Sequence, residues 1–278
     1  MAHPSITCPE CGRATDARYS SCLWCGAALP PSGGRVIEVL SGGKSSQLVI
    51  NGIIVVNVAY YLLSLLISSG TSLGGGLFGF LSPDDNSLAL LGATGTYPVS
   101  RYGVWTLVSA NYLHGGALHI LFNMMALRQI GPWVCAEFGA SRMFVIYTTS
   151  GVAGYVLSVL AGVPFTIGAS AAVCGLIGAL FYFGKSRGGN YGQAVSREVS
   201  GWLISLVVFG LVMPGINNWG HGGGIVGGIV AAKLLGYRER SRENWVHHAA
   251  ALLCLLVTFI VLAFGTWYGV RVLSYRHF

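Results

Sequence analysis

The feature that most constrains the fold of this chain of 278 residues is a series of apolar stretches that contain no Asp or Glu. A helix needs about 20 consecutive apolar residues to span the hydrocarbon core of a bilayer. Charged residues make up 9% of the sequence, well below the share in a soluble domain. Seven stretches approach or reach the spanning length: residues 48–69, 105–131, 143–162, 170–184, 201–213, 219–235 and 249–270. The sequence therefore predicts an all-α polytopic membrane protein.

The placement of basic residues along these stretches predicts an orientation. If the N-terminus is cytoplasmic, only Arg101, Arg271 and Arg276 of the 16 Lys and Arg residues lie outside. Cytoplasmic loops carry an excess of Lys and Arg, so this asymmetry also accounts for the net charge of +7. We expect an integral protein of a bacterial-type inner or plasma membrane, with its C-terminus outside. The expected partner is the lipid bilayer and not nucleic acid.

A cysteine cluster precedes the first stretch. Cys8, Cys11, Cys22 and Cys25 form two CxxC steps, each followed by Gly. Two such turns supply four thiolates in tetrahedral geometry, which predicts a structural zinc in a zinc ribbon over residues 1–29. Two disulfides or a rubredoxin-like iron site are the alternatives, although disulfides rarely persist in a reducing cytoplasm.

Residues 30–47 are rich in Pro, Gly and Ser, which predicts a flexible linker between the ribbon and the membrane domain. Residues 36–40 within it have the composition of a short strand.

Polar side chains inside a membrane-spanning stretch are costly, so each one is a functional candidate. His119 and Asn123 are four residues apart and share one face of the second stretch, with His114 near its outer end. Ser170 begins the fourth stretch, and His221 lies in the sixth beside a run of glycines. At 1.5 Å per residue, Ser170 and His221 lie roughly 22 and 18 Å from the next lysine of their helices. Both therefore fall within the hydrocarbon core.

These residue types fit nucleophilic catalysis. A serine hydroxyl needs a base to take its proton, and hydrolysis needs donors aimed at the developing oxyanion. Ser170, His221, His119 and Asn123 supply these groups. Taken singly, the small residues after Ser170 are also a helix-packing face, and a lone membrane His is more often structural or part of an ion path. The combination favours a serine hydrolase.

Three motifs appear in order: HGGALHILFN over residues 114–123, GASA over 168–171 and HGGGIVGG over 221–228. With them, the sequence over about residues 48–236 resembles the rhomboid intramembrane serine proteases. The resemblance implies a six-helix bundle as the protease core. Residues 237–278 would add a cytoplasmic loop, a seventh transmembrane helix and an outward-facing tail.

The resemblance also implies roles for the polar residues. Ser170 would attack the scissile carbonyl, and His221 would act as base and then as acid. This Ser-His dyad needs no carboxylate and no catalytic cofactor. Asn123 and His119 would donate to the oxyanion together with the Ser170 amide, and Gly168 would permit the tight approach. The substrates would be transmembrane proteins, cleaved at a site that faces outside.

Other motif residues would be structural. His114 would stabilise the first outer loop, while Gly224 and Gly228 would bring the sixth helix against the fourth. The sequence departs from the family pattern at Thr106, where an Arg is common, and at Cys174, where an aromatic residue is frequent.

Two other classes of function fit the sequence less well. A non-catalytic member of the superfamily would have lost the serine or the histidine, and both are present. A transporter would tend to show an internal repeat, and none is visible.

Overall fold

The computed structural model describes residues 5–8, 13–16, 21–27, 44–71, 79–213 and 215–274. Near the N-terminus, β1 (Ser5–Thr7) and β2 (Ala14–Asp16) form a two-stranded antiparallel sheet. The strand expected at residues 36–40 lies outside the described residues. The remaining named elements of the described chain are helices, as expected for an all-α polytopic membrane fold.

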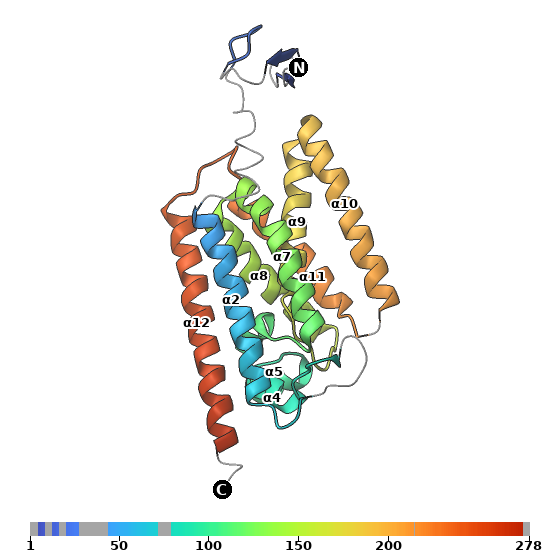
Figure 1. The fold of residues 1–278 in the computed structure, drawn as a ribbon, viewed down its shortest axis with the longest axis vertical. Coiled ribbons are helices and arrows are strands. Elements are labelled where there is room, and N and C mark those ends of the chain that lie inside the picture. Colours follow the sequence, from blue (N-terminus) through green and yellow to red (C-terminus); the bar gives the residue numbers. More distant parts are fainter. Residues whose placement is uncertain are drawn as a thin grey trace.

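Seven long helices in the described part of the chain run along the long axis of the molecule (Figure 1). They are α2 (Lys44–Leu66), α7 (Ala117–Phe138), α8 (Ala140–Leu160), α9 (Ser170–Arg187), α10 (Gly189–Val212), α11 (Asn218–Leu235) and α12 (Trp245–Ser274). Of the described helices, α2, α8, α10 and α12 have the length and apolar composition of a membrane span. The glycines and polar side chains of α7, α9 and α11 lower the hydropathy of those helices.

Two predicted boundaries are wrong. The second stretch was expected to begin at Trp105, but α7 begins at Ala117. Gly115 and Gly116 directly before it interrupt the helical conformation. The fifth stretch was expected at residues 201–213, but α10 begins at Gly189. Charged residues limit the part of a helix that lies in lipid, and they do not end the helix itself.

The longer helices also contain carboxylates that the predicted stretches lacked. Glu137 lies near the end of α7 and Glu198 lies in the first half of α10. In addition, α2 begins at Lys44, so the last residues of the predicted linker are helical.

The described residues between α2 and α7 form four short helices: α4 (Asp85–Leu90), α5 (Thr96–Tyr102), α6 (Thr106–Ser109) and η1 (Ala110–Tyr112). Figure 1 shows α4 and α5 at the end of the bundle opposite the start of α2. Asp84 caps α4 by accepting the Ser87 N–H at 2.9 Å. Burial opposes ionisation of Asp84, but hydrogen bonds from Ser68, Ser87 and Ser69 outweigh it and lower its pKa to about 2.

Glycines let α8, α9 and α11 pack closely. A Cβ atom at Gly224 would overlap the carbonyl oxygen of Ala171, and one at Gly228 would overlap that of Gly175. Both glycines therefore lie at the contact between α11 and α9. Backbone approach of this kind is how membrane helices gain packing energy, since lipid offers no hydrophobic driving force.

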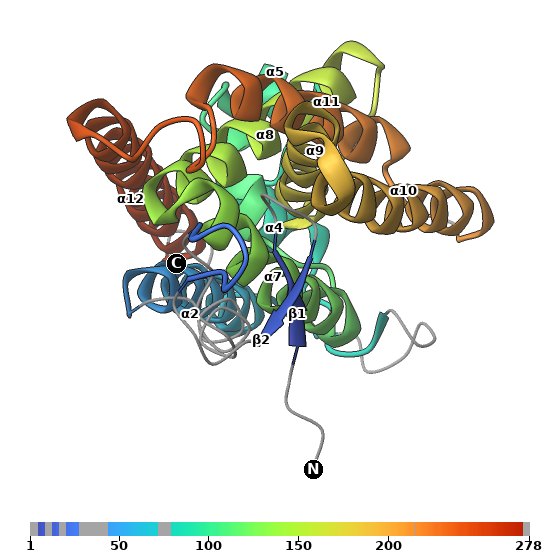
Figure 2. The same ribbon diagram turned by 90° about the horizontal axis from the view of Figure 1, so that it is seen from above.

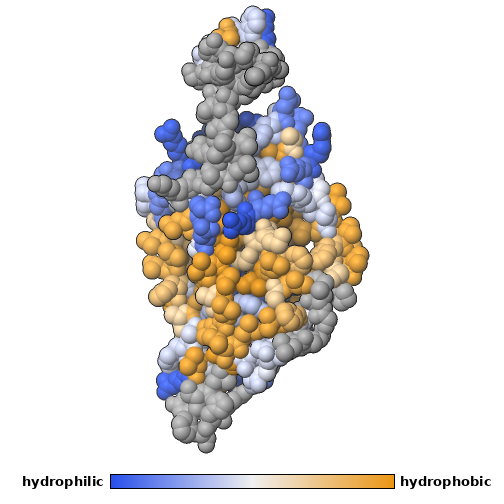
Figure 3. All heavy atoms as spheres, in the orientation of Figure 1, coloured by the Kyte–Doolittle hydropathy of each residue, from blue (hydrophilic) through white to orange (hydrophobic). Residues whose placement is uncertain are grey.

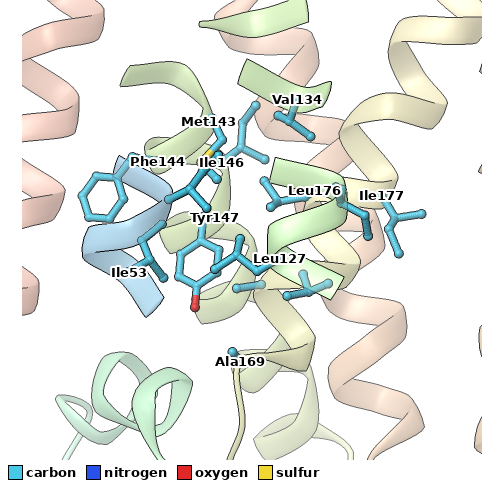
Figure 4. Packing of buried hydrophobic residues seen from close by; sticks show 14 of the residues in the cluster. Ile53, Leu127, Val134, Met143, Phe144, Ile146, Tyr147, Ala169, Leu176 and Ile177 are labelled. Carbon is cyan, nitrogen blue, oxygen red and sulfur yellow. The ribbon is translucent and has the colours of Figure 1, made fainter. Parts of the chain in front are cut away.

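A buried apolar cluster joins α2, α7, α8 and α9. Figure 4 shows Ile53, Leu127, Ile146 and Leu176 from these four helices converging on one another. Seen from above, α10 and α12 lie at opposite edges of the bundle (Figure 2). On the face that Figure 3 shows, hydrophobic residues form a belt across the middle of the molecule, with hydrophilic residues toward both ends. The belt matches the hydrocarbon layer that the sequence predicts.

The loop between α11 and α12 is fastened to the core by Arg142 at the start of α8. The Arg142 side chain is fully buried and donates hydrogen bonds to the carbonyl oxygens of Ser241 and Arg242. In return, a Glu243 carboxylate oxygen accepts the Arg142 backbone N–H at 2.9 Å. This network holds the loop that leads into α12 against the start of α8.

Candidate active site

Ser170 and His221 meet inside the bundle. Ser170 is the first residue of α9, and His221 lies in the first turn of α11. The His221 Nε2 and Ser170 Oγ atoms are 2.9 Å apart, which is hydrogen-bond distance. The other ring nitrogen, Nδ1, is buried and has no hydrogen-bond partner within the described residues. The pair therefore has the geometry of a nucleophile and its base, with no carboxylate behind the histidine in this part of the chain.

The backbone before Ser170 is held in a defined shape. Gly168 has φ +122°, a conformation that favours glycine, and its N–H donates to the Ala110 carbonyl at 2.9 Å. The Tyr155 hydroxyl donates to the Gly168 carbonyl. Two residues earlier, Thr166 and Thr94 exchange backbone hydrogen bonds of 2.7 and 3.0 Å. The start of α9 is thus fixed to η1, α8 and the segment before α5.

His119 of α7 lies beside Gly168. Its Nδ1 accepts the Gly115 backbone N–H at 3.3 Å, so the ring hydrogen of the neutral tautomer belongs on Nε2. A Cβ atom built on Gly168 would lie 2.6 Å from His119 Nε2 and 3.8 Å from Ser170 Oγ. The two side chains therefore flank the same point, and His119 has an N–H donor available next to the nucleophile.

Asn123 lies one helical turn after His119 and is almost completely buried. Its Nδ2 donates to the His119 carbonyl oxygen at 2.9 Å, a bond within its own helix. His114 is fully buried, and its ring centroid is 5.0 Å from that of His119 in an edge-to-face arrangement. Neither ring nitrogen of His114 has a partner within the described residues.

Asn217 was not among the predicted site residues, yet it lies between the two halves of the site. Its Nδ2 donates to Ser158 Oγ at 2.8 Å and to Thr166 Oγ1 at 2.9 Å. Its Oδ1 accepts the Gly220 N–H at 2.9 Å and so caps α11. An Asn directly before a helix is a recognisable start signal, but its contacts with distant segments leave no trace in the sequence.

The structure also shows where the two residues that depart from the family pattern lie. The Thr106 hydroxyl donates to the Gly103 carbonyl at 2.9 Å and lies 3.2 Å from the Thr94 hydroxyl. Cys174 is buried in α9, one turn after Ser170.

A cavity of about 430 Å³ lies between α7 and α10. It is lined by Ala126, Gln129, Ile130, Ile177, Trp202, Ser205, Leu206 and Phe209. Gln129, Ser205 and Phe209 are exposed, so the cavity opens on the side of the bundle.

The cysteines near the N-terminus come together in the structure. The sulfur atoms of Cys8, Cys22 and Cys25 lie within 4.8 Å of one another, and those of Cys8 and Cys25 are 3.6 Å apart. Tetrahedral zinc with Zn–S bonds of about 2.3 Å places its sulfur ligands about 3.8 Å apart. The Trp24 N–H donates to the Cys22 sulfur at 3.4 Å, as expected for a CxxC turn. Cys11 lies outside the described residues.

The fold and the site together define a class: polytopic helical membrane proteins with a serine–histidine pair between two helices. The family model for the Rhomboid domain matches residues 101–238. This range contains the serine–histidine pair and the motif of α7. The chain belongs to the rhomboid family.

Three relatives illustrate the similarity. Rhomboid protease GluP of Bacillus subtilis (strain 168) is 31% identical over 155 residues, which is 56% of this chain and 31% of the relative. RHOMBOID-like protein 4 of Arabidopsis thaliana is 33% identical over 214 residues, which is 70% of this chain and 53% of the relative. Putative rhomboid protease YdcA of Bacillus subtilis (strain 168) is 30% identical over 142 residues, half of this chain and 70% of the relative. The chain thus spans about a third to a half of the first two.

Proposed function

We propose that this chain is an intramembrane serine protease, which hydrolyses peptide bonds in or near transmembrane segments of membrane proteins. The observation that carries the proposal is the 2.9 Å hydrogen bond between Ser170 Oγ and His221 Nε2 inside a membrane-spanning bundle. Two of the similar proteins described above carry the word protease in their names.

The first half of the reaction forms an acyl-enzyme. Ser170 Oγ attacks the scissile carbonyl carbon while His221 Nε2 takes the hydroxyl proton. The tetrahedral intermediate then collapses, the C–N bond breaks, and His221 gives the proton to the leaving amine. Water next attacks the ester, and His221 again takes a proton and returns it to Ser170. The products are a free amine and a free carboxylate.

The negative oxygen of each intermediate needs donors. The Nε2–H of His119 and the backbone N–H of Ser170 are the natural pair, because the first N–H groups of a helix have no partner within the helix. Asn123 would join them by turning its amide away from the His119 carbonyl when substrate binds. Among the residues that the structure describes, no carboxylate bonds His221 Nδ1, so the orientation of the ring depends on the packing of α11.

The substrate has to reach the site from the lipid. A cavity of about 190 Å³ between α10 and α11 is lined by His221 itself, and Val207 and Leu211 on its α10 side are exposed. A transmembrane helix that unwinds beside this opening would present its backbone to Ser170. Small, helix-weakening residues near the outer face of the membrane would favour such unwinding.

The orientation follows from charge. We propose that the start of α2, the end of α9 and the loop after α11 face the cytoplasm, because 13 of the 16 Lys and Arg residues then lie on the cytoplasmic side. The active site then opens in the outer half of the bilayer of a bacterial-type inner or plasma membrane. The expected substrates are membrane proteins with a segment in that half.

The N-terminal unit is proposed to be a zinc ribbon. Cys8, Cys22 and Cys25 would hold the metal, with Cys11 as the fourth ligand expected from the sequence. The metal would stabilise a unit too small to have a hydrophobic core. It takes no part in peptide hydrolysis.

The protease assignment is tested with purified protein and a generic single-span substrate in detergent. We expect cleavage by the wild type and by the control Ser200→Ala, whose hydroxyl donates only to the Ser196 carbonyl in its own helix. Ser170→Ala and His221→Ala should lose cleavage. Equal cleavage by wild type and Ser170→Ala would refute the assignment.

A further inference from the structure

We propose that Asn217 is a positioning residue for the Ser170–His221 pair. Its side-chain amide ties the segment before the nucleophile to the helix that carries the base. This inference deepens the proposed function and rests on it.

We call the hydrogen bond from the Asn217 amide to the Thr166 hydroxyl the tie. Thr166 lies four residues before Ser170, and Asn217 lies four residues before His221. The Asn217 Nδ2 donates to Thr166 Oγ1 at 2.9 Å, while His221 Nε2 and Ser170 Oγ are also 2.9 Å apart. In the described part of the chain, side-chain hydrogen bonds therefore join these two segments at both ends of a four-residue interval. One bond is the reactive contact, and the other is remote from the reacting atoms.

Both residues of the tie are also anchored to other parts of the bundle. Asn217 Nδ2 donates at 2.8 Å to Ser158 of α8, whose hydroxyl donates to the Gly154 carbonyl at 2.9 Å. Thr166 is held independently by its two backbone hydrogen bonds to Thr94. A single amide therefore sets α11 against two segments that are themselves anchored.

Helix capping alone does not explain an asparagine here. The cap needs only the Oδ1 atom, which accepts the Gly220 N–H at 2.9 Å, and a serine provides such an acceptor equally well. The Nδ2 donor contributes nothing to the cap and is used only for Ser158 and Thr166. Because His221 Nδ1 has no partner in the described residues, the placement of α11 is what directs its ring toward Ser170.

The test distinguishes the two roles of Asn217, which are the hydrogen bond to Thr166 and the capping of α11. Asn217→Ser keeps an acceptor for the cap and loses the reach to Thr166. Thr166→Val removes the hydroxyl at the other end and keeps the shape of the side chain. Thr148→Val is the matched control, because its hydroxyl donates only to the Phe144 carbonyl in its own helix. Asn217→Asp is the conservative variant, since its second carboxylate oxygen can accept a hydrogen bond from the Thr166 hydroxyl.

In single-span substrate cleavage, Asn217→Ser and Thr166→Val should each lower kcat about tenfold, with KM close to the wild-type value. Asn217→Asp should recover most of the loss, and Thr148→Val should match the wild type. An unchanged kcat in both Asn217→Ser and Thr166→Val would overturn the proposal. So would a loss in Thr148→Val equal to that in Thr166→Val.

Amide hydrogen exchange gives a reading that does not depend on activity. Thr166→Val should speed exchange in residues 166–169 and 217–221, and Thr148→Val should leave both segments unchanged. If the wild type shows no cleavage that depends on Ser170, the proposed function fails. Amide hydrogen exchange then still tests whether the hydrogen bond between Asn217 and Thr166 holds the two segments together. Unaltered exchange in Thr166→Val would then overturn it.

Discussion

Replacing Gly168 with alanine tests how closely His119 is placed against the nucleophile. A Cβ atom at this position would lie 2.6 Å from His119 Nε2, whereas ordinary contact begins at 3.4 Å, so the ring must move by about 0.8 Å. Gly168 also has φ +122°, and such a conformation costs a residue with a side chain about 1–3 kcal/mol. The variant therefore combines backbone strain with displacement of the proposed oxyanion donor.

The two effects have different consequences. Loss of one oxyanion donor typically lowers kcat by about 10²–10³, and the nucleophile and base are left in place. We expect Gly168→Ala to cleave a single-span substrate about a hundredfold more slowly, with KM little changed. The free energy of unfolding should fall by about 1–3 kcal/mol.

Gly162→Ala is the matched control. Gly162 lies in the same connection between α8 and α9 and has φ +81°, but a Cβ atom there would meet nothing within 4 Å. It should show a similar loss of stability and retain activity. Steady-state kinetics and thermal unfolding of both variants measure the two effects. If the two variants lose activity equally, or if Gly168→Ala keeps wild-type kcat, the placement of His119 is wrong.

Three further predictions concern packing, pH and metal. Gly224→Ala should lower the free energy of unfolding by about 1–3 kcal/mol, because the new methyl group would overlap an α9 carbonyl oxygen. Gly222→Ala, with open space at its Cβ position, should be nearly neutral in the same unfolding assay. The pKa of Asp84 is lowered to about 2 in the folded chain against about 3.9 when unfolded, so its carboxylate stabilises the fold above pH 4. The difference in unfolding midpoint between wild type and Asp84→Ala should shrink as pH falls from 4 toward 2. A constant difference would contradict the lowered pKa of Asp84. Metal analysis of the full chain should find about one zinc per molecule, and Cys8→Ser should lose it while Ser170-dependent cleavage survives.

Much of the architecture could be predicted from residue types alone. The apolar stretches without Asp or Glu predicted seven helices, and seven long helices are present in the described chain, with the fourth beginning at Ser170 as expected. Helix ends were harder to predict, because hydropathy indicates where lipid lies and not where backbone hydrogen bonding stops. The start of α7 at Ala117 and the start of α10 at Gly189 are the clearest examples.

The sequence by itself determined which reactive groups this protein possesses. A serine, two histidines and an asparagine inside apolar stretches have few roles other than chemistry or helix contact, since lipid makes them costly. Only the tertiary structure decided how these groups meet. The 2.9 Å contact between Ser170 and His221 depends on glycines that let α11 approach α9. Likewise, the amide of Asn217 finds Ser158 and Thr166 only because three segments distant in the sequence converge at one point. Residue chemistry is local and can be recognised in a sequence, whereas distances between side chains depend on the packing of the whole bundle.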